Sequence, residues 1–421
     1  MIADGVPTRP RLTWLLTTLA LGAVMAWLPV QAAVWTERHT WDDAWEARYS
    51  AWVAAEWTDD FLLDPKRPAY AGIAHDCADI PALARLIFAY ENGLPFAIHD
   101  AAGGRLTHQS KRFDALPAGA ARLRAFMNHV TKAVSTQTLP DDTYPIALAE
   151  IRPGDLYLAP GEHAYFVTGV RDNGVIEYVY STTPTAAQNL IRQRTFPAYV
   201  PTDDITMRDG YRRFRRPDEL GLTYAQIARF SDQQYSVARD AGYEFEQFNQ
   251  TLAQLLGAEP ETRPQRGERL IDEVCEMSRQ RLRYVDDGVR YLQTIRAQGR
   301  RCLSESEYRQ YSTFNRDQRL TTLWWQLRGL YRSLSSLGED SSTLRLLRAI
   351  FDPYEASPKE RAAIAGRCAL VLNETTAIDL IDLWRIVQQN RLDADPHADR
   401  LQRWGLRDPP LESACPRYDD R

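Results

Sequence analysis

The chain of 421 residues lacks an excess of charge of either sign, and its formal net charge is only −5. Proteins that bind nucleic acid concentrate positive charge on one surface, so nucleic acid is excluded as an expected partner. Internal repeats and low-complexity tracts are also absent. The composition, 44% hydrophobic and 25% charged, indicates a globular protein with a substantial core and a length typical of two or three domains.

Long apolar runs are absent except near the N-terminus, where one run covers residues 12–30. Arg9 and Arg11 precede this run and the small residues of "VQA" follow it, which predicts a signal peptide over 1–32, cleaved after Ala32. An uncleaved anchor is the alternative, because the run is just long enough to span a bilayer. No cysteine stands at the cut, which argues against a lipid anchor. We therefore expect a periplasmic or secreted protein without stable membrane insertion after cleavage.

Cysteine is scarce, with five residues in the whole chain. In an oxidising compartment an even set of cysteines tends to pair, and an odd one remains free. Cys77 is alone in the first half, so we expect a free thiol there and two disulfides in the second half. Three pairings of the other four are possible. The pairing of sequence neighbours is our expectation, namely Cys275 with Cys302 and Cys368 with Cys415.

Aromatic residues, in contrast, are plentiful, and four of them fall on one face of a predicted helix. Trp41, Trp45, Tyr49 and Trp52 follow one another at spacings of four, four and three, which is the spacing of a helix face. Such a face could stack on sugar rings or pack against the domain that follows. We favour the packing interpretation.

The chain changes character near residue 206, which predicts two domains after the signal peptide. Residues 33–205 mix helical and strand-like patterns, and "DNG" between "HAYFVTGV" and "VIEYVY" predicts a hairpin. Residues 206–421 have helical patterns almost throughout. The basic run "RRFRRP" at 212–217 marks the expected boundary, as a solvated linker or as a site for anionic wall polymer. The expected fold class is an α+β domain followed by an all-α C-terminal domain.

The stretch "HDCADIPALARLIFAY" places the lone cysteine at the front of an apolar helical run. Asp76 is a good N-cap, and Pro81 is tolerated only near a helix start, so the helix should begin at Asp76 or Cys77. Unpaired backbone N–H groups there lower the pKa of a thiol and can also hold an oxyanion. Asp76 and Asp79 oppose thiolate formation. A reactive thiol at this position therefore needs a histidine close to it in space.

His163 is the best placed of the seven histidines to serve as that base. It opens a strand-like run after a tight polar turn, and a histidine at a strand start can project toward a helix N-terminus. Cys77 would then be the nucleophile and His163 the general base. His75 is adjacent to the cysteine in sequence, but neighbouring side chains at a turn usually point apart. On the residues alone, a buried structural cysteine remains the alternative.

The segments "DCADIPALARLIFAYENGLPF" and "RPGDLYLAPGEHAYFVTGV" together resemble the NlpC-type cysteine peptidases of the papain-like group. Asp76 and Cys77 match the family's Asp-Cys at a helix start. Residues 154–156 match its Gly-Asp-Leu strand, and His163 matches its catalytic histidine. The resemblance covers roughly residues 66–185. It implies a papain-like α+β catalytic domain with an N-terminal helix against a small antiparallel sheet.

The chain departs from this family pattern at several positions. Ala78 and Asp79 replace the usual Ser and Gly, and an insertion at 94–150 lengthens the interval between the cysteine and the histidine. The family's aromatic-Gly-Gly loop is reduced to "YAGIAH", in which Tyr70 stands in for a substrate-contacting or oxyanion tyrosine. The resemblance also implies that Asp76 binds the free amine of a short wall peptide, although the same side chain would serve as the helix cap.

The third catalytic residue should lie in "VIEYVYST" and accept a hydrogen bond from the imidazole. The hairpin turn decides the candidates, because side chains alternate between the two faces of a strand. A two-residue turn would put Tyr180 and Thr182 on the face of His163. A three-residue turn with a glycine bulge would put Glu177 and Ser181 there. We expect Glu177, with a solvent-facing glutamate as the alternative.

These residues lead to the hypothesis of a secreted cysteine hydrolase that cleaves amide bonds, with peptidoglycan or another cell-wall peptide as its partner. Cys77 would attack the carbonyl and His163 would accept the proton. An acyl-transfer (transglutaminase-like) enzyme is one alternative, because water and an amine attack the same thioester. A catalytically inactive cell-envelope binding or scaffold protein is the other. None of the three requires a metal or a cofactor, and none fixes the oligomeric state.

Overall fold

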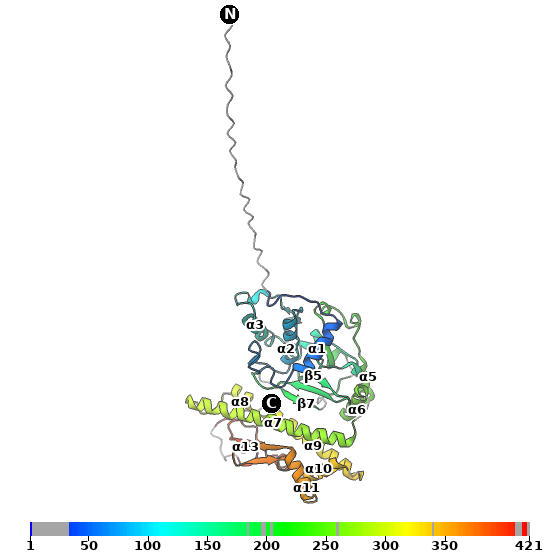
Figure 1. Cartoon of the computed structure of the whole chain (residues 1–421), viewed down its shortest axis with the longest axis vertical. Helices are drawn as coiled ribbons and strands as arrows, with labels where there is room; N and C mark the ends of the chain where they lie inside the picture. Colours follow the sequence, from blue (N-terminus) through cyan, green and yellow to red (C-terminus); the bar gives the residue numbers. More distant parts are fainter. Residues whose placement is uncertain are drawn as a thin grey trace.

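The computed structural model divides into a mixed α/β part and a helical part (Figure 1). Beside Met1, the structure describes residues 33–182, 185–194, 199–202, 205–257, 261–338, 341–408 and 415–418. The predicted signal peptide therefore lies outside the described residues, apart from Met1. No helix within the described ranges is both long enough and apolar enough to cross a membrane.

The α/β part is built on an antiparallel sheet, as the sequence predicted. Within the described residues the sheet has six strands, in the order β3-β8-β4-β5-β6-β7, and each neighbouring pair is antiparallel. In chain order the strands are β3 (Thr143–Pro145), β4 (Leu156–Ala159), β5 (His163–Val170), β6 (Ile176–Tyr180), β7 (Ile191–Gln193) and β8 (Gly210–Phe214).

Helices cover both faces of this sheet, so its strands are buried on both sides. On one face lie α1 (Asp43–Glu56), α2 (Asp79–Asn92) and α3 (Ala120–Val130), and on the other α5 (Gln233–Asp240) and α6 (Phe245–Leu256). Leu156 and Leu158 of β4 pack toward α2, while Tyr157 between them packs toward α6. Alternate residues of each strand therefore belong to two different cores.

Shorter elements complete the α/β part. They are β1 (Ala97–His99), which pairs with β2 (Arg105–Thr107), then α4 (Leu139–Asp142) and the 3-10 turns η1 (Lys111–Phe113), η2 (Leu148–Glu150), η3 (Ile205–Met207), η4 (Pro217–Glu219) and η5 (Tyr224–Gln226).

The aromatic face predicted near the N-terminus is a packing face. Trp41 and Tyr49 are buried, and their ring centroids lie 5.9 and 5.3 Å from that of Phe88 in α2. Trp45 and Trp52 are half-buried against the same core. These rings fix α1 to α2, and α2 is the helix that follows Cys77.

The domain boundary predicted at residue 206 is wrong. The run "RRFRRP" contributes to β8, which lies inside the sheet between β3 and β4. Arg212 and Arg213 are buried there because each finds acceptors: Arg212 donates to Thr143 Oγ1 at 2.7 Å, and Arg213 forms an ion pair with Asp155 at 2.8 Å. Helices α5 and α6 also pack on the sheet, so the helical part begins only with α7.

The helical part is built around the long helix α7 (Arg263–Ala297), which packs against α9 (Phe314–Ser336) and α10 (Ser342–Phe351). The remaining helices are α8 (Glu305–Tyr311), α11 (Pro358–Arg367), α12 (Leu380–Gln388) and α13 (Arg400–Arg403). A short hairpin of β9 (Ala369–Val371) and β10 (Ala377–Asp379) shows that the all-α expectation was too simple.

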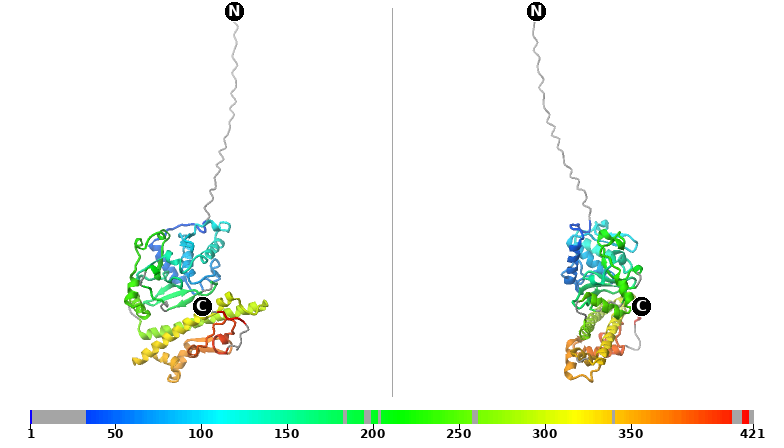
Figure 2. Two further views of the ribbon diagram at one scale, coloured as in Figure 1. Left: turned by 180° about the vertical axis from the view of Figure 1, so that it is seen from behind. Right: turned by 90° about the vertical axis from the view of Figure 1, so that its right-hand side faces the viewer.

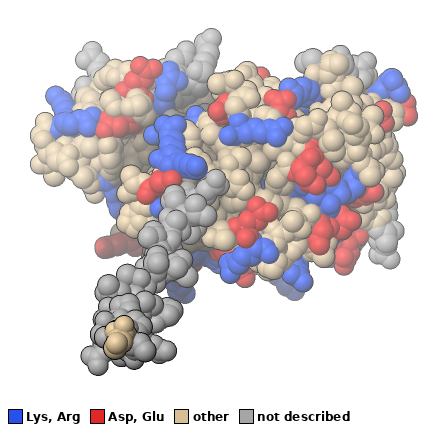
Figure 3. Space-filling model, turned by 90° about the horizontal axis from the view of Figure 1, so that it is seen from above, with Lys and Arg blue, Asp and Glu red and all other residues tan. Residues whose placement is uncertain are grey.

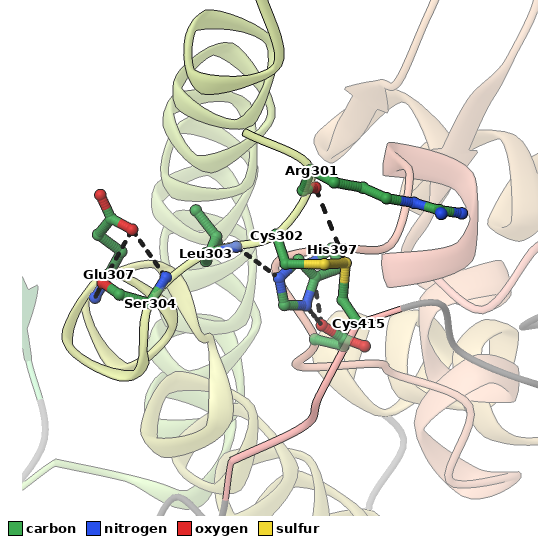
Figure 4. Close-up of a disulfide and its surroundings, with 8 residues drawn as sticks. Arg301, Cys302, Leu303, Ser304, Glu307, His397 and Cys415 are labelled. Atoms are coloured by element: carbon green, nitrogen blue, oxygen red, sulfur yellow. Dashed lines mark hydrogen bonds and ion pairs between the residues drawn. A yellow bond between two sulfur atoms is a disulfide. The ribbon is translucent and has the colours of Figure 1, made fainter. Parts of the chain in front are cut away.

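The cysteines confirm the predicted count of disulfides but not their pairing. Cys77 is free, whereas Cys275 bonds to Cys368 and Cys302 bonds to Cys415 (Figure 4). The expected pairing of neighbours is wrong for a geometric reason. Between Cys275 and its C-terminal end, α7 extends for about 30 Å. Cysteines that far apart cannot meet, because a disulfide needs Cα atoms within about 7 Å.

The two parts lie end to end, and the views in Figure 2 show the helical part on the same side of the sheet from both directions. The edge strand β7 faces α7, where the backbone N–H of Arg194 donates to Glu273 Oε1 at 3.0 Å. Figure 3 shows the molecule from the opposite end, where cationic and anionic side chains are interspersed. That face carries no patch of one sign that would favour a polyanion.

Replacing Glu273 by glutamine should stabilise the protein above pH 7. Burial raises the pKa of Glu273 to about 7 from a usual value of 4.5. The folded state therefore binds a proton more tightly than the unfolded state, and the stability that this proton gives is lost as the pH rises from about 4.5 to 7. Glutamine keeps the acceptor without the charge. We expect a gain of up to about 3 kcal/mol at pH 8 and none at pH 4, measured by urea unfolding.

The exposed residue Glu374 provides the control for this measurement. Its replacement by glutamine should change the free energy of unfolding by less than about 0.5 kcal/mol at either pH. A Glu273→Gln protein that is less stable than the wild type at pH 8 would show that the buried carboxylate is stabilising.

Candidate active site

Cys77 lies in the turn that leads into α2, two residues before the helix begins. Asp76 Oδ1 accepts the N–H of Ala78 at 3.1 Å, and Asp79 Oδ2 accepts the N–H of Asp76 at 2.8 Å. The two aspartates thus close the turn. The predicted N-cap role of Asp76 is wrong, because α2 begins at Asp79 and its N-cap is Ala78, which forms no side-chain cap. The residue Cys77 is buried and only 7% exposed.

The structure brings Cys77 and His163 to one cavity. His163 is the first residue of β5, where it pairs with Ala159 of β4. Both side chains line a cavity of about 470 Å³, a size typical of sites for small ligands. No hydrogen bond joins Cys77 to His163, both of which belong to the described part of the chain. The cavity therefore contains both the predicted nucleophile and the predicted base, with no hydrogen bond between these two described residues.

The environment of Cys77 keeps the thiol protonated. Burial, followed by the negative charge of Asp76, raises its pKa to about 11. The backbone N–H groups of Ala164 and Ala78 offset part of this rise, and Asp79 adds to it. Asp79 contributes little at neutral pH, because burial and the Asp76 charge raise the pKa of its own carboxyl to about 9. Cys77 is therefore a neutral thiol at pH 7.

The environment of His163 keeps the imidazole neutral. Burial and the positive charge of Arg319 hold its pKa well below the usual 6.5. Its ring packs against Tyr165 and Tyr180, with centroid distances of 4.4 and 5.1 Å, and its Nε2 atom is buried without a hydrogen-bond partner. A neutral imidazole has a nitrogen lone pair that can accept a proton, which is the state that a general base requires.

The third residue expected from the sequence, Glu177, does not reach the site. Its neighbour across the hairpin is Gly169, six residues or about 20 Å along β5 from His163, and its carboxylate pairs with Arg171. The register of the hairpin shifts between Val167 and Gly169. This bulge changes which side chains of β6 lie on the same face of the sheet as His163. Tyr180 therefore packs on His163, in place of the expected residues Glu177 and Ser181.

The other site residues expected from the sequence have structural contacts. Tyr70 is buried, donates to Glu91 Oε1 at 2.8 Å and does not line the cavity, so its assignment as a substrate-contacting residue is not supported. Asp76 accepts the N–H of Ala78 within the turn and a hydrogen bond from Thr185 at 3.2 Å. His75 faces Ser181, with 2.9 Å between Nδ1 and Oγ, rather than the cavity. Of the predicted set, only Cys77 and His163 therefore meet.

Half of the cavity wall comes from the helical part, which the sequence did not reveal. Residues from α7 and α9 close the cavity opposite Cys77: Met277, Asn315, Gln318, Arg319, Thr322, Leu323 and Gln326. The wall of the α/β part consists of Cys77, Glu162, His163, Tyr165, Thr182, Gln193, Tyr199 and Phe245. Because the helical residues lie more than 190 positions after Cys77, no local sequence pattern connects them to the site.

Removing the charge of Asp76 should make Cys77 more reactive. Asp76→Asn keeps an oxygen for the Ala78 N–H but removes the negative charge that raises the pKa of the thiol. Alkylation by iodoacetamide at pH 8 should become about tenfold faster for each unit by which the pKa falls. The measurement is the rate of Cys77 modification by mass spectrometry as a function of pH.

Asp79→Asn is the matched control for Asp76→Asn, because its carboxyl is already protonated at pH 8 and carries little charge. The alkylation rate of this variant should equal that of the wild type at pH 8. Equal rates for Asp76→Asn and the wild type would mean that Asp76 does not set the pKa of the thiol.

Among the described residues, no group of three or more His, Cys, Asp and Glu side chains is placed to hold a metal ion. The chain matches no protein-family model, no curated protein and no solved structure. The chemistry of the site therefore has to be argued from its own residues.

Proposed function

We propose that the protein is an exported cysteine hydrolase of papain-like type, which cleaves amide bonds in peptidoglycan peptides. The observation that carries this proposal is the shared cavity, in which a helix-start cysteine and a strand-start histidine lie on the same wall. The two disulfides support an oxidising compartment, in which Cys77 remains a free thiol.

The reaction would proceed through a thioester. The sulfur of Cys77 attacks the amide carbonyl carbon while its proton passes to an imidazole nitrogen of His163. The C–N bond then breaks, and the amine leaves with the proton that His163 returns. Water attacks the thioester, which releases the acid and restores the thiol. The neutral state of both groups requires this proton transfer to accompany the attack, since no thiolate exists beforehand.

A catalytically inactive binding or scaffold protein is the second candidate, and two observations favour it. The pKa of Cys77 is raised to about 11, whereas activated cysteines have a lowered pKa. Tyr180, an aromatic residue, packs on His163 where the hydrolase hypothesis needs a side chain that orients the imidazole. In this candidate the cavity would bind a wall peptide without cleaving it.

Incubation of the intact protein with soluble peptidoglycan fragments tests the proposal. Mass spectrometry should detect a new free amine and a new free acid in equal amounts. Addition of a primary amine separates hydrolysis from acyl transfer, because a transferase would yield the amide of the added amine. Fragments that bind but remain uncleaved at every pH from 6 to 10 would favour the inactive candidate.

A further inference from the structure

Unpaired buried polar groups gather on one side of the cavity. His163 Nε2 and Arg319 Nη1 are both buried without a hydrogen-bond partner, and both residues line the cavity. Tyr180, whose hydroxyl interacts with the Arg319 guanidinium, packs against His163 but does not line the cavity. Such groups are rare in folded proteins, because each costs about 1–3 kcal/mol when it is left unpaired. Their occurrence around a single cavity is characteristic of a binding site, where the atoms of a ligand complete the hydrogen bonds.

Arg319 is the cation of this cluster, and it comes from the helical part. Its guanidinium lies 4.4 Å from the ring centroid of Tyr180 and 5.6 Å from that of Tyr165. Within the described part of the chain it forms no ion pair with an aspartate or a glutamate. A guanidinium cannot lose its proton, so this positive charge is fixed and faces the cavity.

The chemistry of these groups selects an anion with two acceptor oxygens. Arg319 Nη1 is a hydrogen-bond donor, and a neutral imidazole donates from Nε2 when the proton resides there. A cationic ligand would face the fixed charge of Arg319, and a neutral ligand would leave that charge unpaired. Glu162, the carboxylate that also lines the cavity, is exposed to solvent, whereas the Arg319 Nη1 atom is buried. A carboxylate satisfies both donors and forms the strong charge-assisted bond that arginine favours.

We propose that Arg319 Nη1, supplied by the helical part, forms a carboxylate-binding subsite beside Cys77. The proposal deepens the function given above and rests on it, because the carboxylate would belong to the acyl compound that Cys77 attacks or to a small carboxylate bound beside that compound. A bound carboxylate would also neutralise the charge of Arg319. The imidazole of His163 could then accept a proton more easily, since Arg319 is the cation that opposes it.

Alkylation of Cys77 with two reagents of similar size tests whether the carboxylate belongs to the acyl compound that Cys77 attacks. Iodoacetate and iodoacetamide form the same S–C bond with loss of iodide, but only iodoacetate carries the anionic group. For each protein we take the ratio of the iodoacetate rate to the iodoacetamide rate, normalised to the same ratio for free cysteine. We expect this ratio to be about 10- to 100-fold higher for the wild type than for Arg319→Met. Arg332→Met, an exposed position on the same helix, should keep the wild-type ratio.

Thermal unfolding tests whether a separate small carboxylate binds beside that compound. Acetate should raise the unfolding midpoint of the wild type above the value with acetamide, and the difference should vanish in Arg319→Met. A changed alkylation ratio assigns the carboxylate to the acyl compound, whereas an effect of acetate alone assigns it to a separate ligand. If Arg319→Met matches the wild type in both measurements, the subsite does not exist. Neither measurement requires turnover. If the protein binds carboxylate but cleaves no amide bond, the hydrolase proposal is overturned and the subsite proposal stands.

Discussion

Replacing Cys77 by alanine should abolish amide hydrolysis, with turnover reduced by about 10⁴-fold or more. The loss should be this large because no other described residue of the cavity has a nucleophilic side chain in a comparable position, at the start of a helix and beside a histidine. The measurement is the rate of amine release from peptidoglycan fragments. Far-ultraviolet circular dichroism should be unchanged, since alanine removes only a sulfur atom.

Two histidine variants, each a control for the other, test which histidine is the general base. His163→Gln should lose turnover to a similar degree, because His163 is the histidine that shares the cavity with Cys77. His75→Gln should retain turnover, although His75 is nearer in sequence, because its imidazole faces Ser181 and glutamine can keep that contact. Loss of turnover in His75→Gln alone would reverse this assignment. Full turnover in Cys77→Ala would exclude Cys77 as the nucleophile.

Replacing Arg213 by methionine should destabilise the α/β part by about 3–5 kcal/mol. Arg213 and Asp155 form a bidentate pair, with distances of 2.8 and 2.9 Å, between β8 and the turn before β4. Both side chains are buried, and burial raises the pKa of Asp155 even though the Arg213 guanidinium opposes this rise. Methionine leaves the carboxylate buried without its charge partner, which is the costly arrangement.

A second substitution separates the loss of the ion pair from a simple loss of packing. In the double variant Arg213→Met with Asp155→Leu, no unpaired charge remains, so we expect most of the stability to return. Arg239→Met, at an exposed position, should change the free energy of unfolding by less than about 0.5 kcal/mol. Urea unfolding measures all three proteins. A single Arg213→Met variant as stable as the wild type would show that water reaches Asp155.

Local sequence signals predicted the start of the helix beside the site to within three residues. Pro81 lies in its first turn, as expected, whereas the expected N-cap, Asp76, lies three residues before the first helical residue, Asp79. The hairpin at "DNG" followed from the turn chemistry of three residues. These features need no knowledge of the rest of the fold, because the backbone geometry of a cap or a turn is set by its own side chains.

Features that depend on distant partners could not be predicted. Glu177 was the wrong choice because a single bulged position in β5 exchanges the two faces of the strand, and bulges leave no clear mark in one sequence. The arginines of β8 suggested a solvated linker because a basic run is usually exposed, and their buried acceptors lie about 60 to 70 positions away. Arg319 reaches the site only through the packing of α9 against the sheet.

The two disulfides interlock, since Cys302 lies between Cys275 and Cys368 in sequence, while Cys368 lies between Cys302 and Cys415. During synthesis or export the chain emerges from its N-terminus, so Cys275 and Cys302 are both available before either native partner. Oxidation in order of emergence would therefore join Cys275 to Cys77 or to Cys302, and neither of these is its native partner. We infer that maturation of the helical part requires reshuffling by a disulfide isomerase as well as an oxidant, or a delay of oxidation until α7 has formed and holds Cys275 and Cys302 apart.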